Sequence, residues 1–254
     1  MMNNKKIVAT IEARMTSTRL PGKVLMSLYG QPCLYRIIER LRRSKYLDDI
    51  IVATTINQTD DAIVDLCKKI DCHYYRGSEE DVLLRVLEAA KSQNTDIIVE
   101  ITGDCPCIDW RHVDYLIEEF FSGEYDYAAN IIERSFPMGF DAQVFSVSVL
   151  EEVGKITQNP QDREHVSLYI YTHPEKYHLK NWRAEGKMFW PELAVTLDTK
   201  EDYESISKIY EKLYPVNPDF SAEDVIDLMK REPKLQEINK HIIRKNLRKN
   251  LYEE

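Results

Sequence analysis

The stretch IVATIEARMTSTRLPGKVL at residues 7–25 joins an apolar run to a loop rich in basic residues. The run at 7–11 is short and rich in β-branched residues, which favours a strand buried on both faces of a sheet. The loop carries Arg14, Arg19 and Lys23 beside hydroxyl side chains and a Pro-Gly turn. Arginine offers paired donors and lysine a mobile point charge, so the loop could hold a polyanion such as a triphosphate. On these residues alone, a solvated surface loop is an equal alternative, because the loop is neither a Walker A sequence nor a GxGxxG fingerprint.

Downstream of this loop, strand-like apolar runs alternate with segments of helical spacing. Alternation of this kind predicts parallel strands joined by right-handed crossovers. We therefore expect an α/β fold built on a doubly wound, mostly parallel sheet. The expected strands lie at 7–11, 50–53, 73–76 and 96–102, and the expected helices at 34–41, 62–70, 82–90 and 109–123.

The middle and the end of the chain are less regular. The pattern predicts strands at 125–132, 140–147 and 193–197 and helices at 162–172 and 200–213. We interpret the middle as an antiparallel or mixed part of the sheet with a substrate lid. The tail ends in HIIRKNLRKN, whose basic run is most simply a solvated helix end. The expected organisation is one domain at 1–220 with a helical tail at 221–254 packed on it.

Composition narrows the class of protein. The 254 residues include 43 acidic and 34 basic residues, and the net charge of −9 argues against general attraction to nucleic acid or membrane surfaces. Five cysteines without CxxC spacing argue against a zinc site or a disulfide framework and favour a reducing compartment. The apolar run near the N-terminus is too short for a signal peptide or a membrane span. We therefore expect a cytoplasmic protein.

Two aspartates follow apolar runs. Asp104 comes just after residues 97–101, and Asp198 just after residues 193–197. Ligands of open α/β sheets bind beyond the carboxyl ends of the strands, where the basic loop also begins. Two carboxylates brought together there could hold Mg²⁺, although an aspartate at a strand end is more often a helix cap or a turn residue.

The loop sequence also carries a family resemblance. EARMTSTRLPGKVL, followed by Gly30-Gln31-Pro32, resembles the signature of nucleotidyltransferases that activate sugars with CTP, a class that includes CMP-ketodeoxyoctulosonate and CMP-sialate synthetases. Five later segments are similar to the spore-coat-polysaccharide-biosynthesis (SpsF-like) cytidylyltransferase family: GSEEDVLLRVLEAA, ITGDCPCID, PMGFDAQVFS, REHVSLYIYTHPEKY and LDTKEDYE. The segments occur in the family's order between residues 7 and 214, which is more specific than a single motif. The resemblance implies the Rossmann-like fold of nucleotide-diphospho-sugar transferases.

The resemblance also assigns roles to residues. It implies that CTP is held by Ala13, Arg14, Ser17, Arg19, Lys23 and Gly103, with Ser78, Asp81 and Arg85 near the base and ribose. It implies that Asp104 and Asp198 bind Mg²⁺ and act in catalysis with Arg14 and Lys23. The acceptor contacts it implies are Asp141, Arg163 and His165. Taken without the resemblance, the 77–81 segment is an ordinary acidic helix start, and Arg163 to His165 an ordinary surface salt-bridge cluster.

The sequence departs from the ketodeoxyoctulosonate enzymes at Cys105, which replaces an acidic residue and leaves the metal geometry open. The activity implied is transfer of CMP from CTP to a sugar or sugar acid, with pyrophosphate release, in surface polysaccharide or glycoconjugate synthesis. By analogy we expect a homodimer. The alternatives are a phosphorylated acceptor, such as a sugar 1-phosphate or a phosphonate, and a non-catalytic nucleotide-binding protein of the same pathway.

Overall fold

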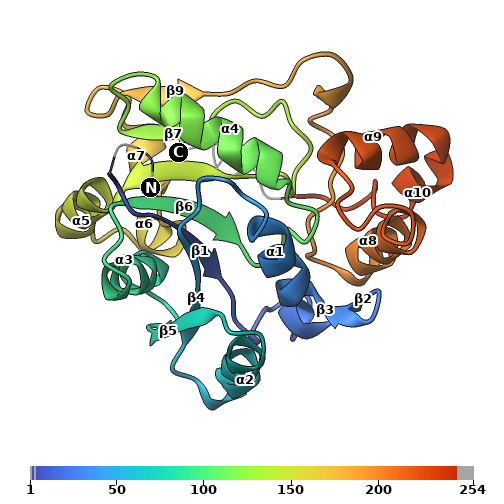
Figure 1. The fold of residues 1–254 in the computed structure, drawn as a ribbon, viewed down its shortest axis with the longest axis horizontal. Helices are drawn as coiled ribbons and strands as arrows, with labels where there is room; N and C mark the ends of the chain where they lie inside the picture. Colours follow the sequence, from blue (N-terminus) through green and yellow to red (C-terminus); the bar gives the residue numbers. More distant parts are fainter. Residues whose placement is uncertain (1, 3, 245–254) are drawn as a thin grey trace.

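Seven strands form one sheet in the order β5-β4-β1-β6-β8-β7-β9, in a computed structural model that describes residue 2 and residues 4–244 (Figure 1). Strands β5, β4, β1 and β6 are parallel, β8 runs antiparallel to β6 and β7, and β9 is parallel to β7. A mostly parallel sheet with a mixed part is therefore confirmed. The strands are β1 Ile7–Glu12, β4 Asp49–Thr55, β5 His73–Gly77, β6 Ile97–Thr102, β7 Tyr127–Ala129, β8 Gln143–Ser146 and β9 Leu179–Asn181, and β2 Ser27–Leu28 pairs with β3 Gln31–Pro32.

Side-chain caps start several helices where the sequence predicts them. Asp81 and Asp109 accept backbone N–H bonds at the starts of α3 and α4, and Thr199 forms a capping box at the start of α8. The α-helices are α1 Cys33–Leu41, α2 Asp61–Lys69, α3 Val82–Ser92, α4 Trp110–Phe121, α5 Val147–Ile156, α6 Pro160–Glu164, α7 Leu168–Thr172, α8 Lys200–Leu213, α9 Ala222–Arg231 and α10 Pro233–Glu237. Three short 3-10 helices are η1 Lys23–Leu25, η2 Gln58–Asp60 and η3 Gly186–Met188.

The sheet separates two apolar cores. Ile7, Ala9 and Ile11 of β1 pack against α1, α2 and α4, whereas Val8 faces α3, α5 and α7 on the other side. This alternation follows from the two-residue period of a strand. A third core beside the carboxyl end of the parallel strands joins α8 and α9 to residues of the loops after β1 and β6 (Figure 1).

Four sequence expectations need correction. The segment 193–197 is not a strand and makes only an isolated bridge between Met138 and Ala194. The helix expected at 162–172 is two short helices, because Val166 adopts a left-handed φ of 45° between α6 and α7. The strands expected at 125–132 and 140–147 are shorter, and α5 takes the end of the second. Residues 241–244 are not helical, and the rest of the expected basic helix end lies outside the described residues.

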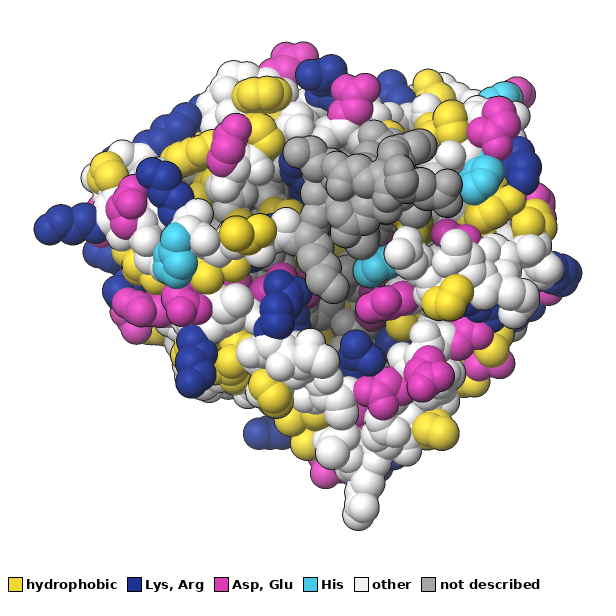
Figure 2. Space-filling model, turned by 180° about the vertical axis from the view of Figure 1, so that it is seen from behind, with side chains coloured by type: hydrophobic (Ala, Val, Ile, Leu, Met, Phe, Trp, Pro, Cys, Tyr) yellow, Lys and Arg dark blue, Asp and Glu magenta, His cyan; other side chains and the backbone are white. Residues whose placement is uncertain are grey.

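The outer surface mixes both charges. Figure 2 shows basic and acidic side chains interspersed over the face opposite to that of Figure 1. Of the helices in the described part of the chain, none is long and apolar enough to cross a membrane. All five cysteines are buried and carry free thiols.

A buried arginine links α1 to the third core. Arg40 is 2% exposed, and its guanidinium donates to the carbonyl oxygens of Ile108 at 2.5 Å and Phe220 at 2.7 Å. The same guanidinium lies 4.3 Å from the centre of the Phe220 ring. Since buried carbonyl groups need donors, Arg40 stabilises the junction between the sheet and the C-terminal helices.

We expect Arg40→Leu to lower the free energy of unfolding by about 2–4 kcal/mol, because two buried carbonyls lose their donors. Urea denaturation measures this loss. Arg42→Leu is the matched control, since exposed Arg42 also donates to two carbonyls, those of Ile70 and Asp71. Water can replace the donor there, so the control should lose less than about 1 kcal/mol. Equal losses in the two variants would show that burial of Arg40 has no special effect.

Candidate active site

The basic loop folds back on itself at the end of β1. The N–H of Gly22 donates to the carbonyl oxygen of Met15 at 2.9 Å, and the N–H of Met15 donates to Asp60 at 2.8 Å. Gly22 has a φ of 73°, a conformation that glycine adopts without strain. This turn places Lys23 at the start of η1, facing back toward the sheet.

The predicted phosphate-binding residues share one cavity of about 1100 Å³ with both predicted metal ligands. Of the residues expected to hold CTP, those that line the cavity are Ala13, Arg14, Ser17, Arg19, Lys23, Arg85 and Gly103. Of the expected metal ligands and acceptor contacts, those that line it are Asp104, Asp198, Asp141 and His165. Gly103 permits the close approach of β1 and β6, because a Cβ there would lie 2.5 Å from the carbonyl oxygen of Glu12. The cavity therefore opens at the carboxyl ends of the central strands.

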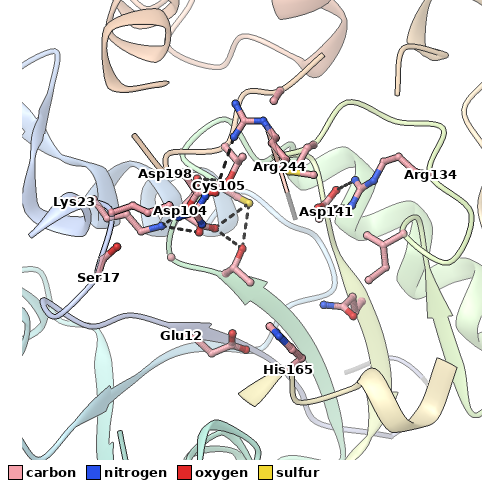
Figure 3. Close-up of a pocket in the computed structure, with 18 of the residues that line it drawn as sticks. Glu12, Ser17, Lys23, Asp104, Cys105, Arg134, Asp141, His165, Asp198 and Arg244 are labelled. Carbon is pink, nitrogen blue, oxygen red and sulfur yellow. Dashed lines mark hydrogen bonds and ion pairs between the residues drawn. The ribbon is translucent and has the colours of Figure 1, made fainter. Parts of the chain in front are cut away.

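Lys23 bridges the two aspartates. Its Nζ donates to Asp104 Oδ2 at 2.8 Å and to Asp198 Oδ1 at 2.9 Å (Figure 3). Burial disfavours the ammonium, but the two carboxylates outweigh burial and raise the pKa of Lys23. Burial likewise works against ionised Asp104, yet the charge and hydrogen bond of Lys23, with a bond from Thr102, hold the pKa of Asp104 below its usual range. Lys23 and Asp104 therefore form a charged pair, which Lys23 extends to Asp198 through its second hydrogen bond.

The aspartates meet although the segment before Asp198 is not a strand. The N–H of Leu197 donates to the carbonyl oxygen of Asp104 at 2.8 Å, and Thr196 Oγ1 donates to the same oxygen at 3.3 Å. These bonds hold the irregular segment beside the loop that follows β6. The convergence expected from the sequence is therefore present, and its physical cause is loop-to-loop hydrogen bonding instead of a parallel strand.

The aspartates suit a hard cation. Among residues 2 and 4–244 there is no cluster of three or more His, Cys, Asp or Glu side chains arranged for a metal. Mg²⁺ does not need such a cluster, because it binds one or two carboxylates and takes its other oxygens from water and phosphates. The ammonium of Lys23 already occupies a cation position between Asp104 and Asp198. The donor set therefore fits Mg²⁺ bound together with a phosphate.

Two glutamates that the sequence did not single out, Glu12 and Glu100, form the floor of the cavity. Glu12 at the end of β1 and Glu100 on β6 line the cavity beside Arg85. Burial, opposed by Arg85 and reinforced by Asp104, raises the pKa of Glu12 to about 8. Burial also raises the pKa of Glu100 well above its usual value, and Glu12 adds to that shift. Within the described residues, Glu12 Oε1, Glu100 Oε2 and Arg85 Nε have no hydrogen-bond partner, so the floor keeps polar atoms for a ligand.

Of the predicted base-site residues, Arg85 alone is among those that line this cavity. Ser78 Oγ accepts from the N–H of Asp81, and Asp81 caps α3 through the N–H of Leu84. Arg85 donates to the carbonyl oxygen of Ser78. Ser78 and Asp81 thus lie behind the cavity wall, where they support the start of the helix that carries Arg85.

Two of the three predicted acceptor contacts line the cavity, and the third lies outside it. Asp141 lines the cavity and is paired with both terminal nitrogens of Arg134, a cavity residue that the sequence did not single out. His165 points into the cavity near Glu12 (Figure 3). Arg163 lies outside the lining and pairs with Asp81 and with the carbonyl oxygen of Gly154.

The interruption of the helix between α6 and α7 leaves His165 facing the cavity. Val166 is fully buried and has a φ of 45°, an unfavourable conformation for a β-branched residue. Backbone conformations of this kind cost about 1–3 kcal/mol and persist only where the surrounding structure holds them. Packing of Val166 in the core below α7 compensates for this cost and leaves His165 on the cavity side.

Known proteins resemble this chain over most of its length. The Cytidylyltransferase family model matches residues 8–242. The chain is 36% identical to the spore coat polysaccharide biosynthesis protein SpsF of Bacillus subtilis (strain 168), over 89% of this chain and 95% of that protein. It is 27% identical to the 3-deoxy-manno-octulosonate cytidylyltransferase of Chloroherpeton thalassium, over 72% of this chain and 70% of that enzyme.

A solved structure matches over nearly the whole chain. The cytidylyltransferase of Leptospira borgpetersenii serovar Hardjo-bovis superposes with a TM-score of 0.87 at 33% identity, covering 95% of this chain and 100% of that one. The resemblance found in the sequence and the Rossmann-like fold are therefore confirmed. Because the family model spans the sheet, the basic loop and both aspartates, the chain belongs to the cytidylyltransferase family and is a nucleotidyltransferase.

Proposed function

We propose that the protein transfers CMP from CTP to a sugar or sugar acid in a Mg²⁺-dependent reaction that releases pyrophosphate. The main support for this proposal is the position of Lys23, which belongs to the basic loop and lies between Asp104 and Asp198. A polyanion and a divalent cation can enter such a cluster together. The relatives, which include a 3-deoxy-manno-octulosonate cytidylyltransferase and a spore coat polysaccharide biosynthesis protein, support the choice of CTP and of a sugar-type acceptor.

The loop binds the triphosphate in this proposal. Arg14, Ser17 and Arg19 contact phosphate oxygens together with Lys23, and backbone groups near Ala13 and Gly103 border the nucleoside. An acceptor oxygen attacks the α-phosphorus, the bond to the bridging oxygen breaks, and pyrophosphate leaves with the charge of that oxygen. Mg²⁺ held by Asp104 and Asp198 would supply positive charge to the phosphate oxygens. Lys23 donates to phosphate oxygens and stabilises the developing negative charge.

The acceptor occupies the far side of the cavity. Asp141, oriented by Arg134, accepts hydrogen bonds from acceptor hydroxyl groups, and His165 takes the proton of the attacking hydroxyl. Arg163 and Asp81 act from behind the wall, where their ion pair holds α6 against α3. Ser78 supports Arg85, which faces the base side of the nucleotide. A phosphorylated acceptor is the alternative for the same fold.

The setting of the enzyme is also a proposal. Five free thiols suit a reducing cytoplasm. The partners are small molecules, without nucleic acid or membrane, because the chain has a net charge of −9. By analogy with the resembling synthetases, the functional unit is a homodimer, and size-exclusion chromatography with light scattering measures it directly.

We expect CTP to stabilise the protein more than UTP, GTP or ATP in the presence of Mg²⁺. A ligand that binds only the native state raises its apparent stability by RT ln(1 + [L]/Kd), or about 2.7 kcal/mol at one hundred times Kd. Thermal-shift titration with the four nucleotides measures this effect, and pyrophosphate release with sugar acids, sugar 1-phosphates and phosphonates identifies the acceptor. Equal or greater stabilisation by another nucleotide would exclude CTP as the preferred substrate.

We expect Asp104→Asn and Asp198→Asn each to reduce turnover by at least about 100-fold, because each removes charge that holds a hard cation. Asparagine keeps the shape, so circular dichroism spectra should match those of the unmodified enzyme. If the aspartates act on one ion, the double variant should be little slower than the slower single variant. Multiplicative losses would show that the two carboxylates act separately.

A further inference from the structure

A buried carboxylate ties the end of the described chain to the active site. The Asp202 side chain is fully buried at the start of α8. Its Oδ2 accepts from the N–H groups of Asp198 at 3.1 Å and Thr199 at 3.0 Å. Its Oδ1 accepts from Asn239 Nδ2 at 2.7 Å and Arg244 Nη2 at 2.6 Å. Asp202 therefore fixes the backbone of Asp198 and the position of Arg244 together.

Arg244 lies in the cavity on the side of Asp198 that faces away from the basic loop. Its Nη1 is 4.0 Å from Asp198 Oδ2, whereas Lys23 and Arg19 both contact Oδ1 at 2.9 Å. Figure 3 shows Arg244 between Asp198 and Asp141. The Arg244 side chain is 14% exposed and lines the cavity with Asn239. Positive charge therefore reaches Asp198 from two sides.

The guanidinium of Arg244 has more N–H donors than its hydrogen bonds to Asp202 use. A guanidinium carries five N–H groups, and Asp202 accepts from Nη1 and Nη2. Among residues 2 and 4–244, the guanidinium makes no hydrogen bond except those to Asp202, and its Nη1 lies 4.0 Å from Asp198 Oδ2 as an ion pair. Asp202 would also keep its other hydrogen bonds if Arg244 turned, which come from the N–H groups of Asp198 and Thr199, the Thr199 hydroxyl and the Asn239 amide. Arg244 can thus meet an anion while the buried carboxylate of Asp202 keeps its other hydrogen bonds.

We propose that Arg244 is a phosphate contact of the active site, which binds the triphosphate of the nucleotide and the pyrophosphate product from the side opposite the basic loop. The inference rests on the proposed use of CTP. The family model ends at residue 242, so the family match does not include Arg244. The basic run that the sequence predicted to be solvated would instead supply a cation to the site.

We expect Arg244→Gln to weaken binding of CTP and of pyrophosphate by about 10- to 100-fold, because a hydrogen bond to a charged group contributes about 1.5–3 kcal/mol. Binding of cytidine, which has no phosphate, should change by less than about twofold. Isothermal titration calorimetry with Mg²⁺ measures all three ligands. The matched control is Lys234→Gln, because Lys234 is exposed on α10 and the change in charge is the same.

Further variants and ligands distinguish the loss of a phosphate contact from a general loss of stability or of nucleoside binding. Arg244→Lys keeps the charge and should recover most of the lost affinity for CTP. If Arg244→Gln lowers the melting temperature, the affinities are compared at a temperature at which circular dichroism shows both enzymes to be folded, and the same selective loss is expected. Unchanged CTP and pyrophosphate affinity, or an equal loss for cytidine, would overturn the inference. An unmodified enzyme that binds pyrophosphate but not CTP would instead overturn the proposed function, and the pyrophosphate comparison would still test Arg244.

Discussion

The ammonium of Lys23 between Asp104 and Asp198 is the interaction on which the site depends. It joins the loop after β1, the loop after β6 and the irregular segment before α8. Two carboxylates this close would repel each other strongly in a partly buried cavity, so the cation is needed to hold them together. The apolar cores place the three segments near one another, and the ion cluster then sets their final geometry.

Most of the fold follows from local sequence. The run at 7–11, the alternation through residue 123 and the caps Asp109 and Thr199 are short-range signals, since burial on both faces and helix starts depend on nearby residues. For the same reason, the predicted helix at 200–213 has the same bounds as α8. The predicted phosphate-binding residues of the basic loop all line the cavity, because this loop directly follows a central strand.

The rest depends on tertiary contacts that no local pattern records. Asp198 reaches the site through hydrogen bonds between loops, although its segment has the apolar composition of a strand. Ser78 and Arg163 carry polar side chains in family motifs, yet both contact backbone or side chains behind the cavity wall. Arg244 sits in a basic run whose composition resembles that of an exposed tail, and its burial against Asp202 is visible only in three dimensions.

Charge balance explains how an acidic protein can accept a triphosphate. Burial raises the pKa of Glu12 to about 8 and that of Glu100 well above its usual value, so the floor keeps protons near neutrality. Lys23 and Arg19 neutralise the aspartates until a ligand arrives. If these cations bind phosphate oxygens as proposed, the aspartates would lose their counter-ions, and two buried carboxylates without a cation are unfavourable. Under the proposed mechanism, a divalent ion held by Asp104 and Asp198 would restore the balance, and binding of metal and nucleotide would then be coupled.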